Sequence, residues 1–398
     1  MTRQMARAEG ATAGREAPGS VKVVFDGTHR SRLPEQTWQW IEPKLPRLGI
    51  TRVADVTWLD EIGIPVFQAV RPNALTLSVS QGKGMSKTLA RVSAAMEAVE
   101  LWHAEHPLAA PVQVGTVEEM ERVVGYRVQD LPLTARHHLN PDLRLSWRTA
   151  HQVDGNDTSL VPADLLRLDY RFDRRWLPPL FRASSNGLAS GNTLAEALLH
   201  GMYETVERDA MARAASGGQP RAVNPETVGN AGLAALLERY RAARVHVQMR
   251  FLDNPFRIPV FDTRIWSDAF PATFAGAGAH LDAAVALSRA LTEAAQSRAT
   301  AIAGARDDIG KAPYREARVF GVRRSSESPP FAGQGDADLP FDTIESSPLP
   351  TLDAEVKHVA NRIREVTGHA PLYVDLTQPD IAIPVVHVVC PGTALQDH

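Results

Sequence analysis

Apolar positions along the chain follow two periods, which predicts a mixture of strands and helices. Alternating or short apolar runs predict strands at 21–27, 51–60, 64–72, 75–84, 246–253, 258–266, 272–280, 371–377 and 383–392. Helical spacing predicts four helices, at 85–105, from just after 192 to about 214, at 281–304 and around 356–366. We therefore expect an α/β or α+β fold without a regular βαβ winding.

Two segments lack such a pattern. Residues 1–20 mix Arg, Glu, Gly and Ala without an apolar run, which predicts a disordered tail and not an export signal. Residues 321–351 are rich in Ser, Pro, Gly and Asp, which predicts a long exposed loop. We expect residues 21–398 to form a single domain.

The composition narrows the class of protein. The 398 residues are 44% hydrophobic and 22% charged, and the formal net charge is −3, as in ordinary globular proteins. No bulk positive charge would attract nucleic acid or anionic lipid, and no apolar run is long enough for a membrane helix. The single cysteine, Cys390, excludes an internal disulfide and a multi-cysteine metal site, and we expect it to be a buried packing residue in a cytoplasmic protein.

An internal repeat carries most of the chemistry. Residues 84–100 align without gaps with residues 191–207, and five of the 17 positions are identical. The identical pairs are Gly84 and Gly191, Ala90 and Ala197, Glu97 and Glu204, Val99 and Val206, and Glu100 and Glu207. The third helix fits the same register through Ala286, Glu293 and Gln296. Three helices therefore present two Glu-x-x-Glu pairs and one Glu-x-x-Gln pair, as expected for a duplicated unit around a shared site.

These acids predict a cation site. At about 100° per residue, Glu204 and Glu207 share a helix face with Asn192 and Glu196, and Ser93 lies one turn before Glu97. Burying several carboxylates together is prohibitive unless cations neutralise them. Oxygen ligands favour Mg²⁺, whereas zinc would need His or Cys. The pairs His103/His106 and His137/His138 lack such partners, so we expect satisfied or surface histidines there.

The balance of charge suggests a nucleotide. Six glutamates oppose four cations, Lys83, Arg208, Arg298 and Arg306, and this leaves an excess of negative charge. ATP adds about four more negative charges, so roughly two or three Mg²⁺ ions would restore neutrality. The Gly-Lys-Gly at 82–84 suits phosphate between a strand and a helix, although the Walker spacing is absent. Each motif alone is more often a solvated helix face or a turn; their combination favours a nucleotide site.

Three blocks, SQGKGMSKTLARVSAAMEAVE, NGLASGNTLAEALLHGMYETVERDA and EAAQSRATAIAGARDD, resemble the nucleotide-site motifs of the YcaO superfamily. They lie within residues 78–106, 186–212 and 280–308, and the resemblance extends from about 50 to about 392. It implies a YcaO-type fold with internal pseudo-symmetry, which binds ATP through several Mg²⁺ ions. By this resemblance the nucleotide residues are Lys83, Ser93, Asn192, Arg208, Glu293, Gln296 and Arg298, and the metal ligands are Glu97, Glu100, Glu196, Glu204 and Glu207.

The resemblance also implies a reaction. YcaO enzymes phosphorylate a backbone amide of a ribosomally made precursor peptide, and the nucleophile decides between azoline, thioamide and amidine. Azoline-forming members typically end in PxPxP, whereas this sequence ends in CPGTALQDH. We therefore expect a thioamide formed with external sulfide from a TfuA-like partner, with azoline or amidine formation as alternatives. A homodimer and a separate leader-binding protein are also expected. A non-catalytic ATP-binding accessory factor is the alternative of another class.

Overall fold

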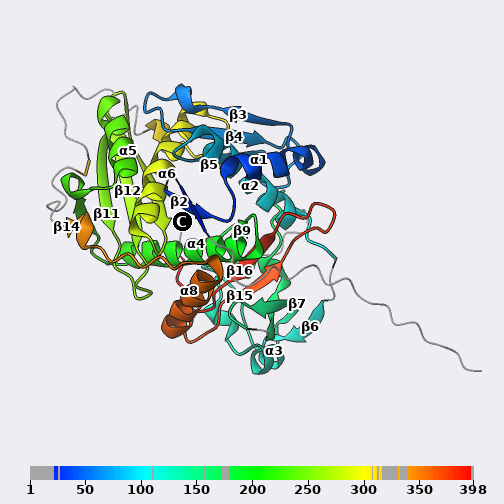
Figure 1. The fold of residues 1–398 in the computed structure, drawn as a ribbon. Helices are drawn as coiled ribbons and strands as arrows, with labels where there is room; N and C mark the ends of the chain where they lie inside the picture. Colours follow the sequence, from blue (N-terminus) through cyan, green and yellow to red (C-terminus); the bar gives the residue numbers. More distant parts are fainter. Residues whose placement is uncertain are drawn as a thin grey trace, which may run out of the picture.

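The computed structural model describes residues 22–25, 27–109, 112–155, 157–171, 179–306, 308–311, 313–315, 330–331 and 339–395 (Figure 1). The predicted tail at 1–20 lies outside these residues. Three sheets carry the fold, and each has one long helix packed on its edge strand. These three strand and helix units contain the repeated motifs.

The first unit is a three-stranded antiparallel sheet with helix α2 packed on β4 and β5. Its elements are β3 (Arg52–Asp55), β4 (Val66–Val70), β5 (Val79–Lys83) and α2 (Lys87–Glu105), with the short helix η2 (Thr57–Leu59) between β3 and β4. The hydroxyl of Ser86 caps α2 by accepting from the backbone N–H of Leu89. Gly82 lets the helix lie against the strand, because a Cβ there would be 2.0 Å from the backbone nitrogen of Ala94.

The second unit is a five-stranded sheet in the order β13-β12-β11-β10-β14, with helix α6 packed on β13 and β12. Its elements are β10 (Arg221–Asn224), α5 (Ala231–Ala242), β11 (His246–Phe251), β12 (Val260–Ser267), β13 (Phe270–Ala279), α6 (Ala283–Ala303) and β14 (Leu339–Pro340). Gly278 occupies the place of Gly82, since a Cβ there would be 2.2 Å from the carbonyl oxygen of Ala286. The close strand and helix packing of the first unit is therefore repeated.

The third unit is a six-stranded sheet in which β6-β7-β15-β16-β9 are neighbours and β8 pairs with β7. Its elements are β6 (Gln113–Thr116), α3 (Val117–Val124), β7 (Arg144–Gln152), β8 (Thr158–Pro162), β9 (Leu188–Ser190), α4 (Leu194–Ala215), α8 (Leu352–Thr367), β15 (Leu372–Asp375) and β16 (Val385–Val389). Helix α4 packs on β9 and β16 and is covered by α8. Gly191 and Gly84 are equivalent here, because each would place a Cβ 2.5 Å from a side chain at the start of its helix.

An N-terminal segment joins the three units. The hairpin β1 (Val23–Phe25) and β2 (Thr28–Arg30) lies between α2, α4 and α6 (Figure 1). Helix α1 (Pro34–Ile41) and the short helix η1 (Glu42–Leu48) follow, and both pack against α2. The segment buries Trp38 and Ile41 in the same core cluster as the apolar face of α2.

Most of the predicted elements are confirmed. The four predicted helices are α2, α4, α6 and α8, and the mixed α and β class is correct. The expected exposed loop at 321–351 is wrong for much of its described part, because β14 pairs with β10 and Leu339 and Ile344 are buried in the core of the second unit. Residues 321–329 and 332–338 lie outside the described residues. None of the described helices is both long and apolar enough to cross a membrane.

Candidate active site

A cleft of about 550 Å³ lies where the three units and the N-terminal hairpin meet. Strand ends β5, β9 and β13 and helices α2, α4 and α6 contribute most of its wall. The structure brings eleven of the twelve predicted site residues to this cleft. They are Lys83, Ser93, Glu97, Glu100, Asn192, Glu196, Glu204, Glu207, Arg208, Glu293 and Gln296.

Basic side chains lie directly among the repeated acids. The ammonium group of Lys83 donates to Glu293 Oε2 at 2.6 Å and so joins β5 to α6. Burial alone would lower the pKa of Lys83, but Glu293 and nearby glutamates raise it above its usual value. The guanidinium of Arg208 lies 4.0 Å from Glu204 and 3.8 Å from Glu207. Lys83 and Arg208 therefore stay charged in the cleft, where they suit an anionic ligand.

Two of the acids are held by the backbone of edge strands. The N–H of Gln81 in β5 donates to Glu97 Oε2 at 3.2 Å. The N–H and the hydroxyl of Ser190 in β9 both donate to Glu100 Oε1, at 2.8 Å and 2.6 Å. Each contact fixes one carboxylate oxygen, and no group among the described residues donates a hydrogen bond to the other. The strand edges thus orient the acids of α2 toward the cleft.

The N-terminal segment holds the first turn of α4. Glu196 Oε2 accepts from the backbone N–H of Asn192 at 2.8 Å and from its side-chain amide at 2.9 Å, and Glu196 Oε1 accepts from the N–H of Ser31. The hydroxyl of Thr37 in α1 donates to Asn192 Oδ1 at 2.8 Å. Two predicted site residues are therefore positioned by a segment that the sequence analysis did not connect with the site.

Burial makes the ionised acids unfavourable. It raises the pKa of Glu100 to about 8 and that of Glu204 to about 7, and it also raises the pKa values of Glu97 and Glu207. A bound cation would relieve this cost. No three acidic, imidazole or thiol groups among the described residues are close enough together to hold a metal ion by themselves.

The donor set nevertheless fits Mg²⁺. The clustered glutamates offer only oxygen ligands, and Gln296 Oε1 is buried with no hydrogen-bond partner in the described part of the chain. Mg²⁺ usually takes only one or two protein carboxylates and completes its shell with phosphate oxygens and water. The arrangement therefore suits a metal that arrives together with a phosphate ligand.

Arg298 is the one predicted residue that the structure places outside the cleft, so its assignment there is corrected. Its side chain is 2% exposed, with Nε 3.1 Å from Asp60 and Nη1 donating to Ser267 at 2.7 Å. The reason is angular, because five residues along a helix turn Arg298 by about 140° away from Glu293. Arg298 ties α6 to the turn after η2, and this is a structural contact.

The sequence analysis missed cations that line the cleft, among them Arg30 and Arg32 in the N-terminal segment and Arg289 in α6. Burial and the neighbouring Arg30 lower the pKa of Arg289 to about 10. The repeat register contained a signal for one of them, since Ser93, His200 and Arg289 each lie four residues before the repeated glutamate. Together with Lys83, Arg208 and Arg306, these three residues give the cleft six cations, which equal its six carboxylates. The excess of negative charge expected from the sequence is therefore wrong.

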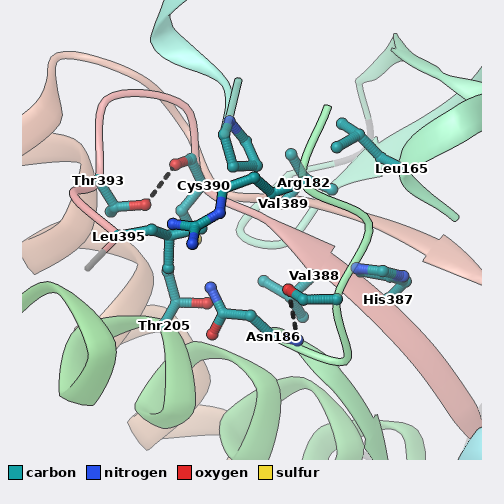
Figure 2. Close-up of a pocket in the computed structure, with 12 residues that line it drawn as sticks. Leu165, Arg182, Asn186, Thr205, His387, Val388, Val389, Cys390, Thr393 and Leu395 are labelled. Atoms are coloured by element: carbon teal, nitrogen blue, oxygen red, sulfur yellow. Dashed lines mark hydrogen bonds between the residues drawn. The ribbon is translucent and has the colours of Figure 1, made fainter. Parts of the chain in front are cut away.

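A second, much smaller cavity of about 40 Å³ lies beside β16, and Figure 2 shows Cys390 in its wall. Cys390 is buried, and burial raises the pKa of its thiol to about 12. The hydroxyl of Thr393 donates to the Cys390 carbonyl at 2.8 Å. The expectation of a packing cysteine is confirmed by its burial.

His103 is also buried, and its Nδ1 lies 2.8 Å from the carbonyl oxygen of Val99. Among the described residues it belongs to no group of side chains that could hold a metal ion.

Comparisons with known proteins agree with this geometry. The family model described as "YcaO cyclodehydratase, ATP-ad Mg2+-binding" matches residues 81–394. An uncharacterised protein of Mycobacterium tuberculosis is 38% identical over 93% of this chain and 83% of its own length. A protein of Rhizobium leguminosarum bv. trifolii, named as uncharacterised in the tfuA 3′ region, is 36% identical over 93% of this chain and 89% of its own length.

Solved structures share the fold. YcaO from Methanopyrus kandleri bound with AMPPCP and Mg²⁺ has a TM-score of 0.70 and 24% identity, covering 94% of this chain and 95% of its own. A heterocyclase in complex with substrate and cofactor has a TM-score of 0.73 and 21% identity. That match covers 96% of this chain, which spans 54% of the heterocyclase. The predicted fold type is confirmed, and the family description confirms ATP and Mg²⁺ as the family's cofactors.

Proposed function

Because the chain belongs to the YcaO family, we propose that it uses ATP and Mg²⁺ to activate a backbone amide of a ribosomally made peptide. The observation that carries this proposal is the cleft itself. Helices α2 and α4 contribute four glutamates whose pKa values are raised by burial, and α6 contributes Glu293, whose pKa Lys83 and Arg208 lower. All of these side chains line one cavity. Such a site suits a polyanion that arrives with divalent cations.

The residues have separate tasks in this proposal. Glu97, Glu100, Glu196, Glu204 and Glu207 would hold the metal ions, and Ser93, Asn192, Glu293 and Gln296 would complete the nucleotide pocket. Lys83 and Arg208 would bind phosphate oxygens, and the two-pronged guanidinium of Arg208 suits them especially well. Because the cleft is formally balanced, roughly two Mg²⁺ ions would neutralise the charge of one ATP.

An amide oxygen is a poor leaving group, and this explains the need for ATP. ATP supplies the phosphoryl group that converts this oxygen into a phosphate, and a nucleophile then replaces it at the carbonyl carbon. The chain's own contribution is to orient the peptide against the nucleotide and to exclude water. Precise orientation of this kind is worth several orders of magnitude in rate.

We further propose that the nucleophile is external sulfide and the product a thioamide, formed with a TfuA-like partner. The amide, ATP and hydrosulfide would then give the thioamide, ADP and phosphate, with one oxygen leaving as phosphate. The name of the Rhizobium relative supports this choice, because it places that protein in a tfuA 3′ region. Cyclodehydration to an azoline is the second candidate, and the family description favours it.

Mass spectrometry of a precursor peptide tests the function. A candidate precursor peptide would be co-expressed with the chain and a TfuA-like protein. We expect exchange of one oxygen for sulfur, which requires the intact cleft and is lost in Glu97→Gln. If the peptide instead loses one water, and this loss depends on a Cys, Ser or Thr of the peptide, the product is an azoline and the thioamide proposal is wrong.

Two further outcomes separate the remaining alternatives. Water loss that survives replacement of those peptide residues would indicate amidine formation by an amine. An unmodified peptide, with no phosphate released from ATP by the purified proteins, would contradict the enzymatic function and leave a binding accessory factor.

A further inference from the structure

Two cations share one aromatic ring, and one of them, Arg32, lines the cleft. The guanidinium carbon of Arg32 lies 4.9 Å from the ring centroid of Trp40 in α1, and Lys44 Nζ lies 4.2 Å from the same ring. Both distances are within the range of a cation–π contact. All three side chains are partly buried, so the ring holds two positive charges close together in a partly desolvated place.

This pair lacks the carboxylates that neighbouring cations have. No acidic side chain of the described residues lies within ion-pair distance of Arg32 or Lys44, whereas Arg47 binds Asp380 and Arg91 lies 3.6 Å from Glu42. Burial, and then the charge of Arg32, lowers the pKa of Lys44. An anion that bound both side chains would remove this repulsion.

The position of the pair indicates the shape of its ligand. Arg32 lines the cleft, but Lys44 does not. A ligand that contacts both must therefore extend from the cleft to the start of η1, where Lys44 lies. A nucleotide enclosed among the acids and cations of α2, α4 and α6 has no need to reach Lys44. A peptide whose reacting amide lies in the cleft would extend in this way.

We propose that Arg32, Trp40 and Lys44 form an anion subsite that binds a carboxylate side chain of the peptide substrate, next to the amide that is activated. The guanidinium of Arg32 offers a two-pronged donor, and Lys44 adds a point charge. The Trp40 ring keeps both cations in place at the rim. This subsite rests on the proposed function, since it selects among peptides that enter the same cleft.

Fluorescence anisotropy with two synthetic probes tests the subsite. One probe is a fluorescein-labelled peptide of alternating Gly and Glu, and the other has Gln in place of each Glu. The full chain, saturated with Mg²⁺ and AMPPCP, should bind the acidic probe about tenfold more tightly, as expected for a charge-assisted hydrogen bond. The double variant Arg32→Gln, Lys44→Gln should bind both probes alike.

Arg91→Gln is the matched control. Arg91 also lies over a tryptophan of α1, at 3.7 Å from the ring centroid of Trp38, but it has an acidic neighbour and does not line the cleft. It should keep the preference for the acidic probe. If Arg91→Gln removes the preference as fully as the double variant does, or if the wild type has none, the subsite is contradicted.

Lys44→Gln alone separates a carboxylate from a phosphate ligand. It should weaken binding of the acidic probe while the affinity for Mg·ATP, measured by calorimetry, stays unchanged. A parallel loss of Mg·ATP affinity would show that the pair binds nucleotide phosphate and would overturn the proposal. Because these readouts need no turnover, they remain informative if the chain modifies no peptide, so failure of the subsite and failure of the proposed function are distinguishable.

Discussion

Replacing Glu204 by Gln should stabilise the ligand-free protein at alkaline pH. Burial raises the pKa of Glu204 to about 7 from its usual 4.5, although the charge of Arg208 opposes the increase. Between these two values the folded protein binds more protons than the unfolded chain does. The free energy of unfolding must therefore fall as the pH rises through this window.

The difference between the two pKa values corresponds to about 3 kcal/mol once the pH exceeds 7. The side chain is 22% exposed, so solvent screening makes this an upper limit. Gln has nearly the same shape and no charge to bury, and we expect it to recover about 1–3 kcal/mol at pH 8. Near pH 5 the gain should be much smaller, because Glu204 is largely protonated in the folded protein.

Urea unfolding of the ligand-free protein at pH 5 and pH 8 measures this effect. Glu118→Gln, on the exposed side of α3 and ion-paired with Arg122, is the control and should change stability by less than about 0.5 kcal/mol at both pH values. Calorimetry should show that Glu204→Gln weakens Mg·ATP binding severely. A Glu204→Gln variant no more stable than wild type at pH 8 would refute the account of the buried acids.

Three other expectations follow from these contacts, and a fourth follows from the resemblance to the YcaO family. Arg208→Lys should lose at least about tenfold in ATP turnover, since a point charge replaces a two-pronged donor; full turnover would make Arg208 structural. Binding of Mg·ATP at pH 7 should release about one proton, because Glu100 and Glu204 are partly protonated before the ligand binds. Calorimetry in two buffers of different ionisation enthalpy measures this release, and a binding enthalpy that is the same in both buffers would contradict it. Gly82→Ala should cost about 1–3 kcal/mol in chemical unfolding, because its Cβ meets the backbone of α2, and an unchanged midpoint would contradict the packing. We propose a homodimer, which light scattering at micromolar concentration tests and a monomer mass would exclude.

The sequence predicted the long helices well because two independent signals coincide in them. Helical spacing of apolar residues and the gapless repeat both identify α2 and α4, and the structure adds equivalent glycines, Gly82 and Gly278, at the strand and helix contacts. The N-terminal hairpin, α1 and α5 were not predicted as such. The strands of the hairpin and α1 are too short to show a clear period. Helix α5 does have helical spacing, since Leu233, Leu236 and Tyr240 are buried on one face and the side chain of Asn230 caps its first turn, so its sequence contained a signal that was missed.

The site residues that belong to the repeat could be predicted from the sequence. The prediction failed for residues whose position depends on contacts between distant segments of the chain. Glu97, Glu204 and Glu293 share one register and all line the cleft. Arg298 belongs to the same block of sequence, but its angular position directs it to Asp60, more than 200 residues away in the chain. Arg30 and Arg32 lie far from any motif, so only the folded hairpin brings them to the cleft.

Transfer of the peptide's own oxygen to phosphate tests the central claim most directly. A precursor peptide with ¹⁸O in its backbone amides would be incubated with the purified proteins, Mg·ATP and sulfide, and the phosphate would be analysed by mass spectrometry. Amide activation predicts one ¹⁸O in the released phosphate for each modified peptide and none with Glu204→Gln. Modified peptide accompanied only by unlabelled phosphate would contradict it.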